Sequence, residues 1–315
     1  MILLGSDTQF NGRWNIRVKT PRNRVWWLEI RGAGEKAIRG SFVGAPLGQV
    51  DEIRDARIEN GTLTFTFDRH SSSRDSNSPL VHQRYSATYK NGQLIGTREE
   101  TIAGKPSPTL SWIGVPAPAI EDRDDGTWTA GTTTQLFNGR NTEGWRLLIG
   151  DQPGWFVEDG SLKNRQGAAD IVSLKKFWNF EARLVYRYSA GSNSGVALRG
   201  RYEIQILDSY GQPPDVHSSG ALYSRIAPAS QACKPAGEWQ TLVARLVGRE
   251  LTVTLNGVRV IDHRDVVGPT AMTMDPDEAG PGPLVLQGDH GPVEFRDVQV
   301  TELVQRGQSI GSPKR

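Results

Sequence analysis

The sequence predicts an all-β protein. It contains 35 Gly and nine Trp among 315 residues, and its apolar residues rarely recur with the period of a helix. Short runs instead alternate apolar and polar side chains, which is the pattern of a strand with one buried face. Asn-Gly pairs separate several of these runs, and Asn-Gly favours tight hairpins because both central residues must adopt positive φ. Short strands joined in this way are typical of β-barrels and β-sandwiches.

Length and charge narrow the classes of function. A chain of 315 residues is long enough for two domains, each with its own core. The 37 basic and 35 acidic residues are interspersed and give a net charge of +2, so no strong field would attract nucleic acid or an anionic membrane. We therefore expect no nucleic-acid partner, and the oligomeric state stays open. The single cysteine, Cys233, excludes an internal disulfide and says nothing about the redox compartment.

No stretch of the sequence approaches the roughly 20 apolar residues that span a membrane. The opening Met-Ile-Leu-Leu-Gly is too short for a secretory signal and lacks its charged first region. We therefore expect a cytoplasmic protein, unless a signal peptide has been removed. In that case a periplasmic or extracellular location is expected.

Residues 1–115 predict a small accessory barrel. Roughly eight short strands follow one another at regular spacing, which fits an up-and-down meander closed as a barrel. Asn60-Gly61 and Asn91-Gly92 are its expected hairpin turns. The opening Gly12-Arg13-Trp14 resembles the start of a lipocalin-like barrel.

Two adjacent tryptophans stand in this first domain, at Trp26 and Trp27. We expect one ring to face the core and the other to pack outside the barrel. The alternative is a sugar-binding accessory module that uses one of the rings as a stacking platform.

A second domain follows a predicted linker. Periodicity disappears over residues 116–133, where Pro, Asp and Thr accumulate, so this stretch is expected to connect the domains. Residues 134–304 then predict the second domain, with a tail at 305–315. About thirteen strands in this range are too many for one small filled barrel, so two stacked sheets are expected. We predict a jelly-roll sandwich in which one curved sheet presents polar side chains to a ligand.

Residues 193–210 are the most regular alternating stretch of the second domain. Apolar side chains from Val196 to Ile206 share one parity. The long polar side chains that share the other are Arg199, Arg201, Glu203 and Gln205. One strand would present this row on the face opposite its apolar side, with Gly200 as a bulge or a close backbone approach. Such groups offer directional hydrogen bonds to a hydroxyl-rich ligand. A solvated strand face with salt bridges is the alternative.

A series of motifs runs through the second domain in order. They are Leu136-Phe137-Asn138-Gly139, Asn193-Ser194-Gly195, Tyr202-Glu203-Ile204-Gln205-Ile206-Leu207-Asp208, Gly220-Ala221-Leu222-Tyr223, Lys234-Pro235, Leu286-Gln287-Gly288-Asp289-His290-Gly291 and Val293-Glu294-Phe295-Arg296. With these motifs, residues 134–304 resemble the 3-keto-disaccharide hydrolase family, whose fold is a concanavalin A-like jelly roll. Gly288 departs from the family pattern, Leu-Gln-Asp-His-Gly, and would shift where His290 points. The first domain lies outside the resemblance.

The resemblance implies an enzyme that acts on glycosides whose C3 hydroxyl has been oxidised to a ketone. Family members look like lyases that eliminate the C1 substituent and hydratases that add water back, which together amount to hydrolysis. A C3 ketone acidifies the C2 hydrogen, so a base can form an enolate that expels the C1 group. This route needs a base near C2, an electrophile on the ketone oxygen and an acid for the leaving oxygen. It does not need two carboxylates at a fixed separation.

The resemblance also suggests which residues carry the chemistry. The candidate catalytic residues are Glu203, His290, Arg199, Asp208 and Lys234. Either Glu203 or His290 is expected to be the base. Arg199 and Lys234 are expected to hold the enolate oxygen, and Asp208 to fix the tautomer of His290. Three of these residues have a structural alternative. His290 would brace a turn, Asp208 would cap a strand end, and Lys234 would be an ordinary surface lysine.

Further residues are expected to bind the carbohydrate. The candidates are Gln205, Arg201, Tyr223 and Gln287. No cofactor is required by this scheme. A divalent metal held by Glu203, Asp208 and His290 is an alternative electrophile, although no His-x-His or Cys-x-x-Cys spacing supports it.

Two other functions stay open at this point. Conventional jelly-roll glycosidases of the laminarinase type carry Glu-x-Asp-x-x-Glu on one strand, where this chain has Glu203-x-Gln205-x-x-Asp208. A carboxamide at the middle position cannot tune its neighbours as a carboxylate does, and this counts against ordinary hydrolysis. A lectin-like carbohydrate-binding protein without catalysis is the other alternative.

Overall fold

The structure is a computed structural model that describes residues 7–19, 25–44, 49–71, 77–149, 154–270, 272–273 and 277–306. Within these ranges the chain is almost entirely strand, turn and loop, and its one helical element is the short 3-10 helix η1 (Asp7–Phe10). None of the described segments is a helix long and apolar enough to cross a membrane. The prediction of an all-β protein is confirmed.

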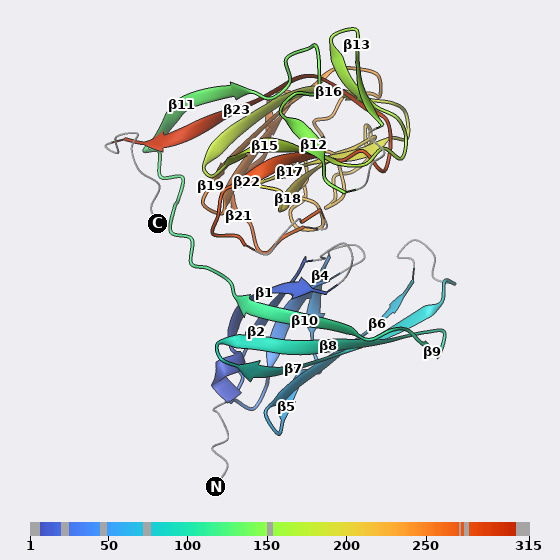
Figure 1. Ribbon diagram of the computed structural model, residues 1–315, viewed down its shortest axis with the longest axis vertical. Helices are drawn as coiled ribbons and strands as arrows, with labels where there is room; N and C mark the ends of the chain where they lie inside the picture. Colours follow the sequence, from blue (N-terminus) through green and yellow to red (C-terminus); the bar gives the residue numbers. More distant parts are fainter. Residues whose placement is uncertain are drawn as a thin grey trace. The chain divides into compact units, whose positions relative to one another are not determined.

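The chain forms two compact units, and unit 1 comprises residues 1–118 together with 273–278. Its strands are β1 (Gly12–Val18), β2 (Val25–Arg31), β3 (Arg39–Val43), β4 (Val50–Ile53), β5 (Arg57–Glu59), β6 (Thr62–His70), β7 (Leu80–Lys90), β8 (Gln93–Ile102), β9 (Lys105–Pro106) and β10 (Leu110–Pro116). They make one antiparallel sheet in the order β4-β3-β2-β1-β10-β8-β7-β6-β5, with β9 beside β8. Because β1 pairs with β10, the predicted meander joins its first strand to its last and curls around a core (Figure 1).

The paired tryptophans of β2 are both buried. Trp26 belongs to the aromatic core, where its ring meets those of Phe42 and Tyr85 edge-on at 5.7 Å each. Trp27 points to the other face of the strand but is also only 1% exposed. Neither ring is therefore available as a stacking platform for a sugar.

Unit 2 comprises residues 119–272 and 279–315. Its strands are β11 (Trp128–Gln135), β12 (Trp145–Leu147), β13 (Trp155–Glu158), β14 (Ser161–Asn164), β15 (Ile171–Phe177), β16 (Phe180–Tyr188), β17 (Asn193–Leu198), β18 (Tyr202–Leu207), β19 (Gln240–Val247), β20 (Glu250–Leu255), β21 (Val258–Asp265), β22 (Gly282–Leu286) and β23 (Val293–Gln305). Eight of them form one sheet, β13-β14-β23-β16-β19-β20-β21 with β11 beside β23, and five form another, β12-β15-β22-β17-β18. Apolar residues of both sheets share one core, so the predicted two-sheet sandwich is confirmed (Figure 1).

Part of the predicted linker at 116–133 is a strand. β11 pairs with β23 from Trp128↔Gln305 to Gln135↔Gln299. Its side chains are half-buried or exposed along its whole length, so this Thr-rich edge strand has no apolar face to reveal it in the sequence. β23 extends to Gln305, where the tail was predicted to begin, and residues 307–315 lie outside the described part.

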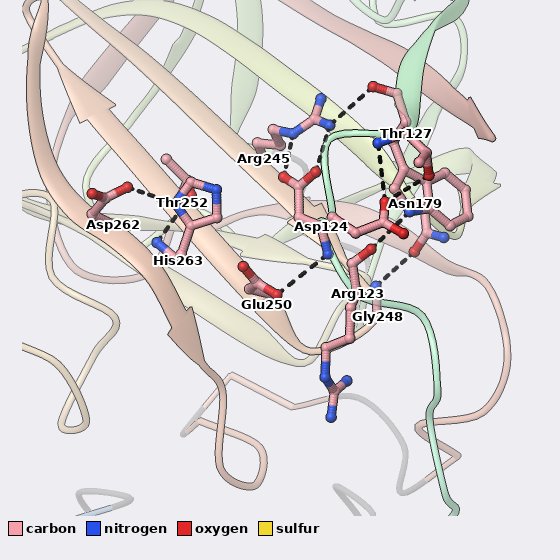
Figure 2. Close-up of polar contacts among 12 residues, drawn as sticks. Arg123, Asp124, Thr127, Asn179, Arg245, Gly248, Glu250, Thr252, Asp262 and His263 are labelled. Carbon is pink, nitrogen blue, oxygen red and sulfur yellow. Dashed lines mark hydrogen bonds and ion pairs between the residues drawn. The ribbon is translucent and has the colours of Figure 1, made fainter. Parts of the chain in front are cut away.

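The segment before β11 is attached to the sandwich by carboxylates (Figure 2). Asp124 accepts two hydrogen bonds from the Arg245 guanidinium of β19, at 2.6 and 2.9 Å. These hydrogen bonds hold the pKa of Asp124 below its ordinary value. The Asp124 N–H donates to Glu250 of β20 at 3.3 Å. The segment is therefore part of unit 2 rather than a free connection.

The stretch 193–210 is a hairpin and not the predicted single strand. β17 and β18 pair from Asn193↔Leu207 to Leu198↔Tyr202. The Arg201 N–H donates to the Leu198 carbonyl at 3.0 Å, and the two residues between them have φ of 52° and 64°, as in a type I′ turn. Three residues separate Leu198 from Tyr202, so the apolar parity continues through the turn. Alternation alone could not show where the chain reverses.

Arg199 lies in this turn and is 1% exposed. Its Nε donates to the Trp178 carbonyl at 2.6 Å, and its Nη1 to the Gly248 carbonyl at 2.7 Å. Its Nη2 donates to Asn179 Oδ1 at 3.1 Å, and the guanidinium lies 3.9 Å from the centroid of the Trp178 ring. The guanidinium thus joins segments of the fold. The prediction that Arg199 stands in a row with Glu203 and holds an enolate oxygen is wrong.

Replacing Arg199 with Ala is expected to destabilise the protein by about 3 kcal/mol, because buried carbonyl groups lose their donor. Thermal denaturation measures this, with Arg264→Ala on the exposed part of β21 as the control, for which a change within about 0.5 kcal/mol is expected. Equal melting temperatures for Arg199→Ala and the unmodified protein would contradict the structural role.

Candidate active site

Polar side chains gather on the face of the five-stranded sheet that is turned away from the core. On β18, Glu203 and Gln205 alternate with core residues. The register places them opposite Ala197 and Gly195 of β17. Because β18, β17, β22 and β15 are consecutive neighbours, polar residues of the same parity on these strands share one surface.

Two more polar residues extend this surface at the ends of β22 and β15. Gln287 directly follows β22, and its N–H donates to the Gly195 carbonyl at 3.0 Å. Asp170 directly precedes β15. Ile171 pairs with Leu286 and both belong to the core, so Asp170 and Gln287 point to the opposite face, the one that carries Glu203.

Glu203 is only 3% exposed, and no described residue donates a hydrogen bond to its carboxylate. Gly195 leaves it room, because a Cβ at that position would lie 2.5 Å from Glu203 Oε1. Burial raises the pKa of Glu203 to about 8, with the charges of Asp170 and Asp289 adding to the rise and His290 opposing it. Burial therefore favours the protonated form of Glu203, which can act as a proton donor.

Asp170 is a buried acidic residue of this surface that the sequence did not reveal. Burial raises its pKa to about 6, and the Gly288 N–H, which donates to Oδ1 at 2.9 Å, opposes this rise. Two carboxyl groups with pKa values of about 6 and about 8 thus share the surface, and such a difference is suited to acid–base chemistry. The available signal was an acidic residue placed directly before the buried run Ile171-Val172.

His290 lies in the loop after β22 and belongs to the same site, since its charge and that of Glu203 each shift the other's pKa. Its Nδ1 is hydrogen-bonded to the carboxylate of Asp289. That hydrogen bond raises the pKa of His290, and the negative charges of Asp289 and Asp170 add to the effect. In the neutral ring the Nδ1 carries the proton and Nε2 is free to accept one. Asp289, and not the predicted Asp208, is therefore the hydrogen-bond partner of His290.

Gln205 and Gln287 flank the carboxyl groups and are 3% and 8% exposed. The Oε1 of each is buried and has no hydrogen-bond donor among the described residues. A buried acceptor without a donor is costly unless a ligand or water supplies one. Each amide therefore keeps an acceptor for a ligand or an ordered water.

Arg201 and Tyr223 lie next to this surface. Arg201 is 2% exposed and donates through Nη1 to the Gly280 carbonyl at 3.0 Å. The Tyr223 N–H donates to the Glu203 carbonyl at 3.0 Å, which covers the free edge of β18. The Tyr223 ring packs edge-on against His217 with centroids 5.1 Å apart.

The side chains of Asp208 and Lys234 are hydrogen-bonded to backbone groups and not to the predicted partners. β18 ends at Leu207, and the Asp208 carboxylate accepts the Gly191 N–H at 2.9 Å, so it caps a turn. Lys234 is exposed in the loop before β19, where its amino group donates to the Trp239 carbonyl at 3.2 Å. Both have the structural role that the sequence left open as the alternative.

The predicted alternative metal ligands do not come together, because Asp208 is held at Gly191. In the parts of the chain described above, no group of three or more His, Cys, Asp or Glu side chains could hold a metal ion.

Part of the chain matches a known protein family. Residues 132–301 match the family model of the 3-keto-alpha-glucoside-1,2-lyase-like domain. The match covers more than half of the chain and contains the whole polar surface. The chain belongs to this family.

A curated relative is a 3-keto-disaccharide hydrolase of Bacteroides thetaiotaomicron, which is 29% identical over 141 residues. The aligned part is 33% of this chain and 49% of the relative, so the chain spans about half of the relative's length.

Two solved structures resemble part of the chain. A candidate glycosyl hydrolase from Parabacteroides distasonis is 24% identical with a TM-score of 0.47, covering 55% of this chain and 94% of that one. The carbohydrate-binding module CBM66 from Bacillus subtilis is 15% identical with a TM-score of 0.36, covering 50% and 96%. At these TM-scores the likenesses say nothing about function.

The raised pKa of Glu203 has a consequence for stability. The folded-state value of about 8 exceeds the ordinary value of 4.5, so between these values the folded protein binds more protons than the unfolded chain. This contribution to stability is lost as the pH rises toward 8. Glu203→Gln cannot ionise, so its free energy of unfolding does not contain this pH-dependent contribution. Between pH 5 and pH 9 the free energy of unfolding of the variant is therefore expected to rise relative to that of the unmodified protein, by on the order of 3 to 5 kcal/mol.

Melting temperatures across this pH range measure the effect. The exposed Glu238→Gln serves as the control and is expected to follow the unmodified protein. A pH profile of Glu203→Gln parallel to that of the unmodified protein would show that Glu203 ionises normally.

Proposed function

We propose that this protein cleaves 3-keto-glycosides by removing the C2 proton, eliminating the C1 substituent and adding water, with hydrolysis as the net result. The substrate class comes from the family and from the name of the curated relative. The observation that carries the proposal is the buried Glu203, whose pKa is raised to about 8, on one surface with Asp170 and near the Asp289–His290 pair.

Glu203 acts as the electrophile on the ketone. When the C2–H bond breaks, its electron pair moves toward C3 and negative charge develops on the ketone oxygen. A neutral carboxyl group in a site removed from water can donate its proton in a hydrogen bond to that oxygen. This supplies the stabilisation that the sequence analysis had assigned to Arg199.

His290 acts as the base through Nε2. Its Nδ1 is turned to Asp289, so the free lone pair of the neutral ring is on the other nitrogen. The imidazolium that forms on accepting the C2 proton is stabilised by the negative charges of Asp289 and Asp170, which also raise the pKa of His290. The same proton can then pass to the departing C1 oxygen.

Elimination leaves a double bond between C1 and C2, conjugated with the C3 ketone. Water then adds its oxygen to C1 and a proton returns to C2, which completes the hydrolysis. Gln205 and Gln287 accept hydrogen bonds from sugar hydroxyls through their buried Oε1 atoms and so hold the ring over the acid and the base.

A conventional glycosidase is less consistent with the site. In the frame Glu203-x-Gln205-x-x-Asp208 the last carboxylate is turned to Gly191 rather than to the polar surface. Without it, Glu203 lacks the second strand carboxylate of that mechanism.

The reaction is tested by incubating the full chain with a 3-keto-glucoside in deuterated water. NMR is expected to show deuterium at C2 of the product, because that position loses and regains a proton. Glu203→Gln is expected to lower kcat by roughly 100-fold or more, since the amide is a weaker donor to the enolate oxygen. His290→Asn is expected to stop exchange at C2.

Parallel incubation with the plain glucoside separates the alternatives, and Glu238→Gln is the control for the substitutions. Turnover of the plain glycoside at a comparable rate would instead support a conventional glycosidase. Binding of either sugar without turnover would support a lectin-like protein.

A further inference from the structure

The loop that carries Asp289 and His290 is held at Gly288 from two sides. The Gly288 N–H donates to Asp170 Oδ1 at 2.9 Å, and its carbonyl accepts from Asn164 Nδ2 at 3.0 Å. Asn164 is the last residue of β14, in the eight-stranded sheet, and is 5% exposed. A residue of one sheet thus holds a loop that completes the site on the other.

The Asn164 side chain is hydrogen-bonded to both ends of this loop. Besides Gly288, its Nδ2 donates to the Gly291 carbonyl at 3.0 Å, and its Oδ1 accepts the Val293 N–H at 2.7 Å. The catalytic pair lies between these anchored positions. A carboxamide is suited to this task because it combines donors and an acceptor in one rigid group.

Gly288 lies where there is no space for a side chain. A Cβ at this position would lie 2.8 Å from the Ala169 carbonyl oxygen and 2.9 Å from Trp155 Nε1. Trp155 is itself fixed, because its Nε1 donates to the Ala169 carbonyl at 2.7 Å. The glycine that departs from the family pattern is therefore the residue by which the loop is held.

We propose that Asn164 is a positioning residue of the active site, which together with Gly288 sets the place and orientation of the Asp289–His290 pair. It does not touch the substrate and acts through the loop. The consequence for turnover rests on the proposed function, whereas the position of the His290 ring can be measured without any substrate.

Replacing Asn164 with Ala removes its hydrogen bonds to Gly288, Gly291 and Val293, while the hydrogen bond between Gly288 and Asp170 remains. The ¹⁵N NMR signals of the His290 ring report the hydrogen bond between Nδ1 and Asp289, and they are expected to shift toward those of a free imidazole. Turnover of a 3-keto-glucoside is expected to fall by about tenfold to 100-fold in kcat, with a smaller change in KM, because a displaced base costs rate more than binding.

Asn179→Ala is the matched control. Asn179 is 4% exposed, and its side chain likewise joins segments of the fold. It donates to Asp122 at 2.9 Å and accepts from the Gly248 N–H at 2.8 Å and from Arg199 Nη2 at 3.1 Å. None of its hydrogen bonds reaches the His290 loop. We expect it to lower the melting temperature as Asn164→Ala does, with the His290 signals near those of the unmodified protein.

Gly288→Ala is the second variant, because it displaces the loop while Asn164 remains. Unchanged His290 signals in a folded Asn164→Ala or Gly288→Ala protein would overturn the proposal. Equal changes in Asn179→Ala would also overturn it, by showing that the effect is general. Shifted His290 signals in a protein that never turns over the keto sugar would support the positioning role and count against the proposed function.

Discussion

The site depends on the burial of one carboxyl group. The Glu203 side chain is removed from water, and no described residue donates a hydrogen bond to it. A charge in such a place is costly, and the group lowers that cost by keeping its proton. His290 opposes this effect, but the burial of Glu203 outweighs it and holds the pKa at about 8. The sheet therefore supplies a neutral acid at neutral pH, which an exposed glutamate cannot provide.

The rest of the fold creates this environment. The β17–β18 hairpin brings Glu203 across from β17, where Gly195 leaves space for its side chain. Arg199 fixes the turn of that hairpin, so the arginine contributes to the site only through the fold. The loop after β22 then adds His290, which is hydrogen-bonded to the carboxylate of Asp289. Asp170 adds a second carboxyl group, with a pKa of about 6, for acid–base chemistry.

Much of this could be predicted from the sequence. Alternation and Asn-Gly turns indicated the strands and the two sheets, and the family motifs pointed to Glu203 and His290. Alternation reports which face a side chain takes but not where the chain reverses, so Arg199 was assigned to a strand face. The sequence did not reveal β11, because the side chains of this exposed edge strand do not alternate between apolar and polar. Asp170 was missed because it meets the site through strand pairing that a single sequence does not reveal.

The protonation state of Glu203 is the central claim, and a carboxyl ¹³C NMR titration of the full chain measures it directly. The signal can be assigned by its absence in Glu203→Gln. The account predicts a titration midpoint near pH 8, with the carboxyl neutral at pH 7. A midpoint near the ordinary value of 4.5 would contradict it, because Glu203 would then be a carboxylate with no proton to donate.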